Sequence, residues 1–340
     1  MRTLYACTAF TIGAALLAPS AAHASPTAID PDPIENISRV APEVFQELEP
    51  IEKTGSETFL SETQNSSTNF DLKDEASFSI KSDSGRSVDV SIPEIGPEGS
   101  VEFDKGVVSV DHGDGSSTVP VPKEDGSVQV TTVIEDSSAP TRYAYDVNSK
   151  SAIEAEILDD GSVVYTNDQN QFVGGVNAPW AKDKHGRDVP TRYELNGMTL
   201  VQVVDHTAID DVAYPVIADP WLGIDLIKSV RQGLEKNVIT INATKSAWGQ
   251  TNHLPTAAKI RLFQGAGWEE VRLKAGRNSK GVYHADSRKS IKQQYFCHVA
   301  AGYGNIAGTW NLEGWRPYRT ASWAYQVQHH HCNWKTANYR

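Results

Sequence analysis

Short runs in which apolar and polar residues alternate fill the chain from Ala76 to Asp219. A period of two is typical of strands with one buried face. We therefore predict a mainly antiparallel, sandwich-like β module over residues 76–220. The runs expected to form strands are Ser77–Ile80, Val88–Ile92, Val101–Phe103, Val107–Val110, Val128–Ile134, Tyr143–Val147, Ala152–Leu158, Val163–Tyr165 and Leu200–Val204.

Clusters of acidic residues and glycine separate these runs, at Asp83–Gly85, Asp111–Gly115, Glu124–Gly126 and Asp159–Gly161. Gly and Asp accept the positive φ that hairpin turns require. Carboxylates also bind calcium, but an EF-hand needs a later bidentate Glu in a helix–loop–helix setting, and no cluster has that register. The pattern favours turns.

The residues before this module predict an acidic arm over 25–75. Apolar positions from Ile34 to Leu48 are spaced like one face of a short amphipathic helix. Residues 56–69 contain few large apolar groups, which favours a flexible linker. The helix either caps the β module or binds a partner.

The pattern changes after Pro220. Pro215 and Pro220 restrict the residues before them to extended conformations, so Tyr214–Pro220 is expected to be a stiff junction. We predict a helix over 221–236 and a strand over 238–243, which together connect the modules as residues 221–244. The helix would place four apolar residues on one face: Ile224, Ile227, Val230 and Leu234.

Residues 245–340 predict a small α+β domain. Helices are expected over Pro255–Gln264 and Ser287–Ala300, with a short element at Trp268–Leu273. The remainder, which carries Trp310, Trp315, Trp323 and Trp334, predicts short elements held by a disulfide.

The first 24 residues predict a secretory signal peptide. A basic start at Arg2 precedes the apolar run Leu4–Ala18 and the small-residue cleavage site Ala22–Ala24. The apolar run is shorter than the roughly 20 residues that span a bilayer. We therefore expect a secreted protein, extracellular or associated with the cell wall, without a transmembrane segment.

Charge reverses along the chain, whose net charge is −12. Residues 25–220 contain 13 Lys and Arg against 37 Asp and Glu, whereas residues 221–340 contain 17 against 6. Such segregation predicts two modules with different partners, or modules that contact each other. A basic domain attracts anions. In an exported protein the nearest anions belong to the envelope, which favours an envelope polymer over nucleic acid.

Removal of Cys7 with the signal peptide leaves Cys297 and Cys332. Two cysteines in an oxidising compartment predict one disulfide. One alternative is a Cys297 nucleophile beside His298. Another alternative is a metal site, because neutral imidazoles bind divalent metals. Its ligands would be Cys297, His298, His329, His330, His331 and Cys332.

Four ordered motifs carry a resemblance over about the last 100 residues. They are Gly267–Val271, Gln294–His298, Thr309–Pro317 and Cys332–Asn333. This pattern resembles the secreted bacterial, mainly actinobacterial, family known as domain of unknown function 2599. The resemblance implies secretion and the cysteine pair. The family has no established activity, and the three histidines are not part of its pattern.

The candidate ligand-binding residues are Trp310, Glu313, Trp315 and Arg316. Aromatic faces beside an acid and a guanidinium can stack sugars or clamp a phosphate. The alternative is a core segment in which the rings pack and Glu313 pairs with Arg316. Weak catalytic candidates are Glu313, His298 and Arg316: a nuclease could use His298 as base, and a glycosidase needs two carboxylates, such as Glu270 with Glu313.

No catalytic motif is present, and we predict no cofactor. The first hypothesis is a non-catalytic secreted protein whose basic C-terminal domain binds an anionic cell-envelope polymer or a partner. The alternative is a secreted antibacterial effector or hydrolase that the acidic β module restrains. A structural surface protein without a ligand is a third possibility.

Overall fold

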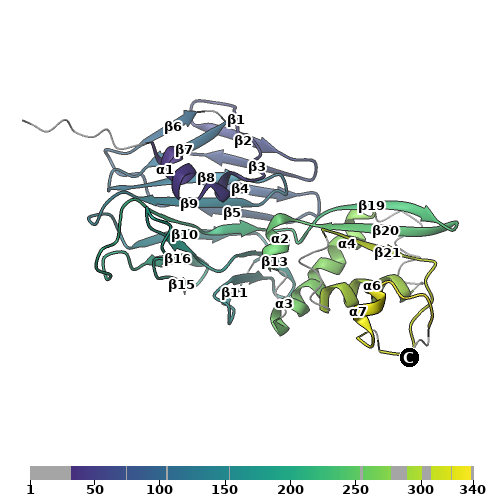
Figure 1. The fold of residues 1–340 in the computed structure, drawn as a ribbon. Helices are drawn as coiled ribbons and strands as arrows, with labels where there is room; N and C mark the ends of the chain where they lie inside the picture. Colours follow the sequence, from purple (N-terminus) through teal and green to yellow (C-terminus); the bar gives the residue numbers. More distant parts are fainter. Residues whose placement is uncertain are drawn as a thin grey trace, which may run out of the picture. The chain divides into compact units, whose positions relative to one another are not determined.

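The computed structural model describes residues 32–337 except 74, 105, 153, 253–255, 277–288, 301–307 and 323 (Figure 1). The predicted signal peptide lies outside the described residues, as do the start of the acidic arm and Trp323. Two large sheets account for most of the chain up to Gly223, and every strand pair in them is antiparallel. The predicted β class is therefore confirmed.

The first sheet has eight strands in the order β1-β2-β3-β4-β5-β10-β16-β15. Side chains alternate between a buried and an exposed face, as in β10, where Tyr143, Tyr145 and Val147 are buried. The strands are β1 (Glu52–Lys53), β2 (Thr58–Glu62), β3 (Ser66–Asp71), β4 (Ser77–Ser82), β5 (Ser87–Ser91), β10 (Arg142–Asn148), β15 (Thr191–Asn196) and β16 (Thr199–Val204).

The second sheet runs β11-β12-β13-β18-β9-β8-β7-β6, and β17 joins it by pairing with β9 and β14. Its inner face packs against the first sheet in one hydrophobic core, which makes the pair a sandwich. Its strands are β6 (Ser100–Asp104), β7 (Val107–Asp111), β8 (Ser116–Pro122), β9 (Val128–Ile134), β11 (Glu154–Ile157), β12 (Val163–Thr166), β13 (Phe172–Val176), β14 (Ala181–Lys182), β17 (Val216–Ala218) and β18 (Trp221–Gly223).

The predicted N-terminal helix is present but shorter. Helix α1 (Pro33–Val40) begins at the cap Asp32, and the 3₁₀ turn η1 (Pro42–Phe45) follows it. Its apolar face covers the outer side of β8 and β9, where Ile37 and Val44 pack against Val119 and Val133. Helix and sheet therefore share a second core, which is why β8 and β9 are buried on both faces.

The predicted flexible linker over 56–69 is wrong, because these residues form β2 and β3. Phe59 and Phe70 point into the core and face each other across the two strands. The smaller Ser61 and Thr68 are also buried. The polar composition of this segment suggested a flexible linker. Two buried aromatic side chains and strand pairing are enough to order it.

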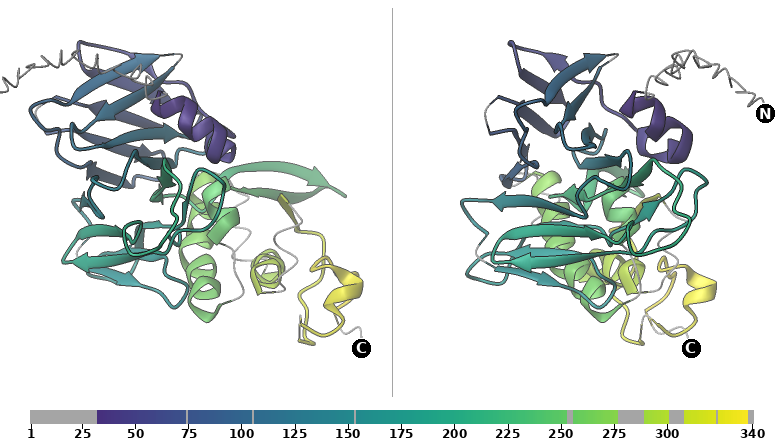
Figure 2. Two further views of the ribbon diagram at one scale, coloured as in Figure 1. Left: turned by 60° about the vertical axis from the view of Figure 1, so that its left-hand side comes forward. Right: turned by 90° about the vertical axis from the view of Figure 1, so that its left-hand side faces the viewer.

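The C-terminal elements form a three-stranded sheet, β19-β20-β21, and a set of short helices (Figure 2). Their core gathers Trp248, Phe263, Tyr295 and Trp310. The elements are β19 (Ile227–Glu235), β20 (Val238–Lys245), β21 (Thr309–Glu313), α2 (Ala247–Asn252), α3 (Ala257–Leu262), the π-helix η2 (Phe263–Gly267), α4 (Trp268–Lys274), α6 (Lys289–Ala300) and α7 (Val327–His330). None of the described helices has both the length and the apolar character needed to cross a membrane.

The predicted helix over 221–236 is wrong. Trp221–Gly223 joins the large sheet as β18, and Ile227–Glu235 pairs with β20 as a hairpin strand. Lys236 and Asn237 both have positive φ, 52° and 57°, as a tight hairpin turn requires. Leu234 is 77 % exposed, so the apolar spacing did not mark one buried face. Long-range pairing overrides the local pattern here.

The predicted disulfide is confirmed. Cys297 on α6 and Cys332 after α7 are joined, with their Cα atoms 5.5 Å apart. Both cysteines are buried beside Trp334. A disulfide excludes the proposed Cys297 nucleophile and a metal site with thiolate ligands, because neither sulfur carries a free thiolate.

Buried polar contacts join the C-terminal elements to the sandwich. Arg86, between β4 and β5, lies 2.5 Å from Glu270 on α4 and 3.3 Å from Asp225. Glu270 also accepts hydrogen bonds from the backbone N–H groups of Leu226 and Ile227. Asp32–Arg340 groups as one compact unit, so the predicted division into independent domains stays a prediction.

Candidate functional site

Trp310, one of the predicted ligand-binding residues, lies inside the C-terminal core. Its side chain is 0 % exposed. Its ring packs at 5.3 Å from that of Tyr295 and stacks at 5.7 Å on that of His298. A sugar cannot reach this ring, and the prediction that Trp310 binds a ligand is wrong for that reason.

The rest of the predicted cluster is engaged within the chain. Cations already contact the Trp315 ring, since Lys236 Nζ lies 3.2 Å and the Arg316 guanidinium 4.4 Å from its centroid. Arg316 forms an ion pair with Glu313 and donates to the carbonyl oxygen of Trp334 at 2.9 Å. These contacts match the alternative in which the segment is part of the folded core.

Asn333 brings the three weak catalytic candidates into one cluster. Its Nδ2 donates to Glu313 Oε2 at 2.7 Å, and its Oδ1 lies 3.2 Å from His298 Nε2. Burial raises the pKa of Glu313, but hydrogen bonds from Arg316 and Asn333 outweigh it and hold that pKa below its usual value. A carboxylate stabilised in this way is a weak general acid or base.

The other predicted chemistry is not assembled by the fold. Glu270, the proposed partner of Glu313, is fully buried and paired with Arg86. His330 contacts Trp334 edge-on and accepts from the backbone N–H of Cys332. Among the described residues, no group of three His, Cys, Asp or Glu side chains could hold a metal ion.

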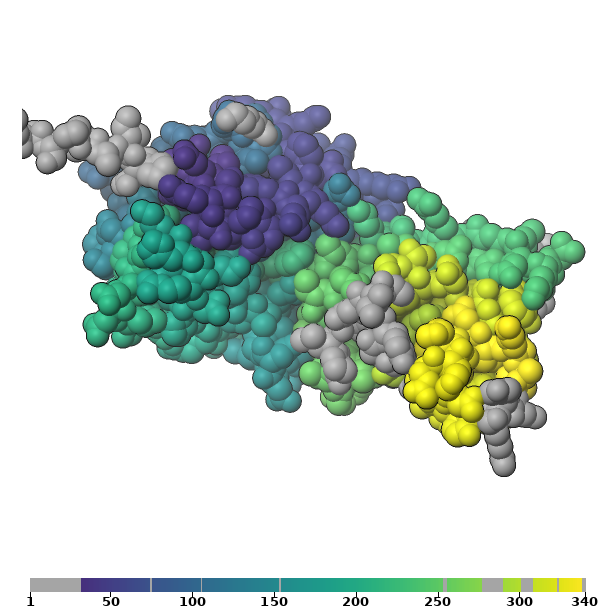
Figure 3. Space-filling model, in the orientation of Figure 1, coloured from purple at the N-terminus to yellow at the C-terminus, as the bar shows by residue number. Residues whose placement is uncertain are grey.

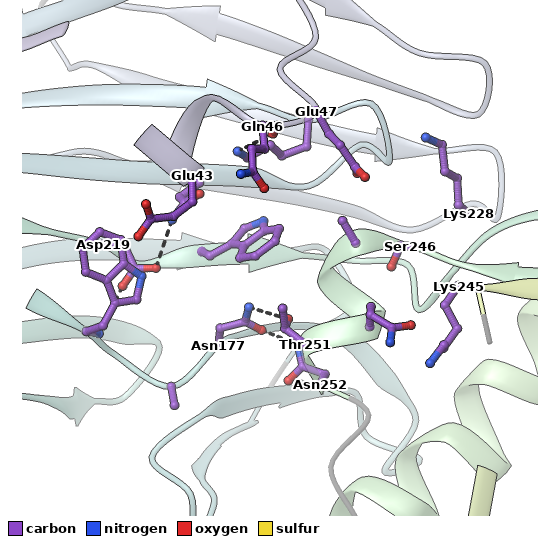
Figure 4. A pocket seen from close by; sticks show the side chains of 18 of the residues that line it. Glu43, Gln46, Glu47, Asn177, Asp219, Lys228, Lys245, Ser246, Thr251 and Asn252 are labelled. Carbon is purple, nitrogen blue, oxygen red and sulfur yellow. Dashed lines mark hydrogen bonds between the residues drawn. The ribbon is translucent and has the colours of Figure 1, made fainter. Parts of the chain in front are cut away.

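A cleft with a volume of about 900 Å³ lies where the sandwich meets the C-terminal elements (Figure 4). Its walls come from η1 and β9, and from β18, β20 and α2 much later in the chain. On the face of the molecule drawn in Figure 3, purple N-terminal residues lie beside green residues of the C-terminal elements. Sequence reasoning missed this cleft.

Five lysines line the cleft: Lys123, Lys182, Lys228, Lys245 and Lys259. Lys123 donates to the backbone carbonyl oxygens of Val44 and Gln46. Burial lowers the pKa of Lys123 and that of Lys245 to about 8. Both side chains therefore remain mostly protonated at pH 7 and lose their charge above pH 8.

Four acidic residues also line the cleft, Glu43, Glu47, Asp160 and Asp219, and lysines compensate the charges of two of them. Glu43 pairs with Lys182 at 2.8 Å, and Asp160 lies 3.4 Å from Lys259. Asp219 is fully buried and accepts from the Trp180 backbone N–H at 3.3 Å. Burial raises the pKa of Asp219 to about 8, so this side chain is mostly neutral at pH 7.

Aromatic and amide groups complete the lining. Trp180 and Trp221 are both half-buried, and each ring is contacted by a cleft lysine, Lys182 at 5.5 Å and Lys123 at 5.7 Å. Asn177 donates to Thr251 Oγ1 at 2.7 Å, and Asn252 donates to Asn177 (Figure 4). Rings beside amides and cations are the groups that hold saccharides and anions.

Two of the predicted turns position this site. In Asp125–Ser127 and Asp160–Ser162 the Asp Oδ1 accepts from the Ser backbone N–H and hydroxyl, which confirms the turn interpretation. The second carboxylate oxygen of each Asp contacts the C-terminal elements. Asp125 Oδ2 accepts from the Trp248 backbone N–H, and Asp160 Oδ2 forms an ion pair with Lys259. The repeated Asp-Gly-Ser sequence was the signal that could have indicated these contacts.

Comparisons with known proteins give no relative: no family model matches the chain, and no curated protein or solved structure matches it. The resemblance of the last 100 residues to domain of unknown function 2599 therefore stays a prediction. Any function rests on the cleft itself.

Proposed function

We propose that the protein is a secreted, non-catalytic binding protein that holds an anionic, sugar-bearing polymer of the cell envelope in this cleft. The observation that carries the proposal is the lining, where five lysines meet two partly exposed tryptophan rings and several amides. The ligand would contact the sandwich and the C-terminal elements together. Binding would then not belong to the basic C-terminal residues alone.

The charge balance of the cleft supports an anionic ligand. At pH 7 Asp219 is mostly neutral, so the five lining lysines outnumber the charged carboxylates, which are those of Glu43, Glu47 and Asp160. Lys123 and Lys245 still carry most of their charge. Burial disfavours the charged form of these lysines, so pairing with an anion would stabilise them and contribute favourably to the free energy of binding.

A Lys228→Gln substitution is expected to weaken binding of the full chain to purified cell-wall sacculi about fivefold, the equivalent of roughly 1 kcal/mol. Lys228 lies on β19 at the cleft, and its side chain is 34 % exposed and within 3.0 Å of Glu124. Co-sedimentation over a salt series measures the effect, and salt should release the wild-type protein.

Lys335→Gln is the matched control, because Lys335 is an exposed lysine of the C-terminal region that does not line the cleft. Like Lys228→Gln, this substitution removes one positive charge from the chain. Equal loss of binding in both variants would mean that diffuse basic charge, rather than the cleft, retains the protein.

Binding to sacculi is expected to fall steeply as the pH rises from about 7 to about 9. Over this range Lys123 and Lys245 become neutral while Asp219 becomes negative, because burial places the pKa of each at about 8. All three changes make the cleft less attractive to an anion. Co-sedimentation at fixed ionic strength tests this, and binding that does not change with pH contradicts it.

A further inference from the structure

A buried lysine, an amide and a carboxylate meet at the wall of the cleft. Lys259 on α3 donates a hydrogen bond from Nζ to the Oδ1 of Asn252, the last residue of α2. The Asp160 Oδ2, from the turn before β12, lies 3.4 Å from the same Nζ. Three separate segments therefore bring a nucleophile, a carbonyl group and a proton acceptor together.

The lysine is placed to act as a nucleophile. Its side chain is 3 % exposed, and Asn252 is also 3 % exposed. Burial lowers the pKa of Lys259, although the nearby Asp160 carboxylate opposes this effect. A desolvated lysine has a larger neutral fraction, and only the neutral amine attacks a carbonyl carbon.

The carboxylate is oriented toward the lysine. Asp160 Oδ1 accepts from the backbone N–H of Ser162 at 3.1 Å and from its hydroxyl at 2.6 Å. Oδ2 remains directed at Lys259 Nζ. Burial raises the pKa of Asp160, but the Ser162 hydrogen bonds and the Lys259 charge lower it below its usual value, so the group is ionised beside Nζ at neutral pH.

The amide is also fixed in orientation. Asn252 Nδ2 donates to the Trp248 carbonyl oxygen at 2.9 Å and to Asn177 Oδ1. Rotation of the carboxamide would break both contacts and the contact with Lys259. The carbonyl carbon therefore stays beside Nζ, the condition that intramolecular reactions exploit.

We propose that Lys259 and Asn252 react to form an intramolecular isopeptide bond. The neutral Nζ attacks Asn252 Cγ, an N–C bond forms, and the Cγ–Nδ2 bond breaks. Asp160 accepts the proton from Nζ and passes it to Nδ2, which leaves as ammonia. No electron is transferred and no co-reactant is needed. The cross-link would tie α2 to α3 whether or not the cleft holds a ligand, and it would leave four of the five cleft lysines as cations.

Mass spectrometry of the reduced, purified full chain tests the proposal without any variant. The expected mass is lower than the sequence mass by one ammonia. Trypsin should fail to cleave after Lys259, because the acylated side chain is no longer a cation. The digest should then contain a single 246–261 peptide that lacks one ammonia, in place of the 246–259 peptide.

Variants separate the cross-link from other losses of ammonia. Lys259→Arg and Asp160→Asn should restore the sequence mass, whereas Lys245→Arg, at another buried lysine of the cleft, should keep the loss. A 246–259 peptide of unchanged mass would overturn the proposal. So would a lighter 246–259 peptide, since a cyclic imide at Asn252 loses ammonia but leaves Lys259 cleavable.

Discussion

Replacing Arg86 with leucine is expected to destabilise the folded chain by about 3–5 kcal/mol, the usual cost of removing one partner from a buried ion pair. Arg86 is 15 % exposed and contacts the carboxylates of Glu270 and Asp225. Lys274, 2.9 Å from Asp225, would still compensate that acid. Glu270 would lose its closest cation. Denaturant unfolding at pH 8 measures the loss.

The loss should shrink at acidic pH. Burial raises the pKa of Glu270 to about 7, so the folded state takes up a proton where the unfolded chain does not. Once Glu270 is neutral, the missing guanidinium no longer leaves a buried charge. Arg142→Leu is the control, because it removes an exposed pair with Glu194 and should change little. Equal stability of the Arg86 variant and this control would contradict the prediction.

The same network is expected to make the described chain unfold in one step. Arg86 belongs to the sandwich, whereas Asp225 and Glu270 belong to the residues after Pro220. Unfolding one part leaves the buried charges of the other without their partners, which penalises a half-folded state. A fragment that begins at residue 221 would also lose the pairing of β18 with β9 and β13.

Asp219→Asn is expected to stabilise the protein at pH 9, by up to about 5 kcal/mol, and to leave its stability nearly unchanged below about pH 4. Asp219 is fully buried, and burial raises its pKa from the usual 3.8 to about 8. Between these values the folded state binds a proton that the unfolded state releases. Stability therefore falls as the pH rises through this window, and the asparagine removes the fall.

Asp183→Asn is the matched control for Asp219. Burial raises the pKa of Asp183, but hydrogen bonds from Arg187 outweigh it and lower the pKa below its usual value. Here the folded state prefers the charged form, so its contribution is present at neutral pH and lost on acidification. The control should destabilise at pH 7. Stabilisation of both variants at pH 9 by the same amount would argue against the burial of charge at Asp219.

The sequence predicted β10, whose side chains alternate, and also β9, which is buried along its whole length, but it missed β8 and β13. Strand β8 carries Pro120 and Pro122, and proline is unusual inside a strand, so Ser116–Pro122 did not stand out as one. Strand β13 contains Gly174 and Gly175, which weakened its pattern. A Cβ at Gly175 would lie 2.6 Å from the Val163 carbonyl oxygen, so these glycines permit close packing that only the tertiary structure reveals.

The prediction for Trp310 failed because burial is decided by the tertiary structure. Trp310, Glu313 and Arg316 are close in sequence and suggested a surface, but the fold buries Trp310 in the C-terminal core and pairs Glu313 with Arg316. The cleft lysines are spread from Lys123 to Lys259, and only strand pairing and the Asp-Gly-Ser turns bring them together. Spacing alone cannot report such a site, because no two of these lysines are neighbours along the chain.

Hydrogen–deuterium exchange of the full chain, with and without soluble fragments of purified sacculi, tests most directly whether the cleft binds the polymer. We expect slower exchange in peptides that cover 43–47 and 244–252, which line the cleft. Peptides that cover 309–316 should be unchanged. Protection confined to 309–316, or no protection in the cleft at saturating fragment, would contradict the proposed function.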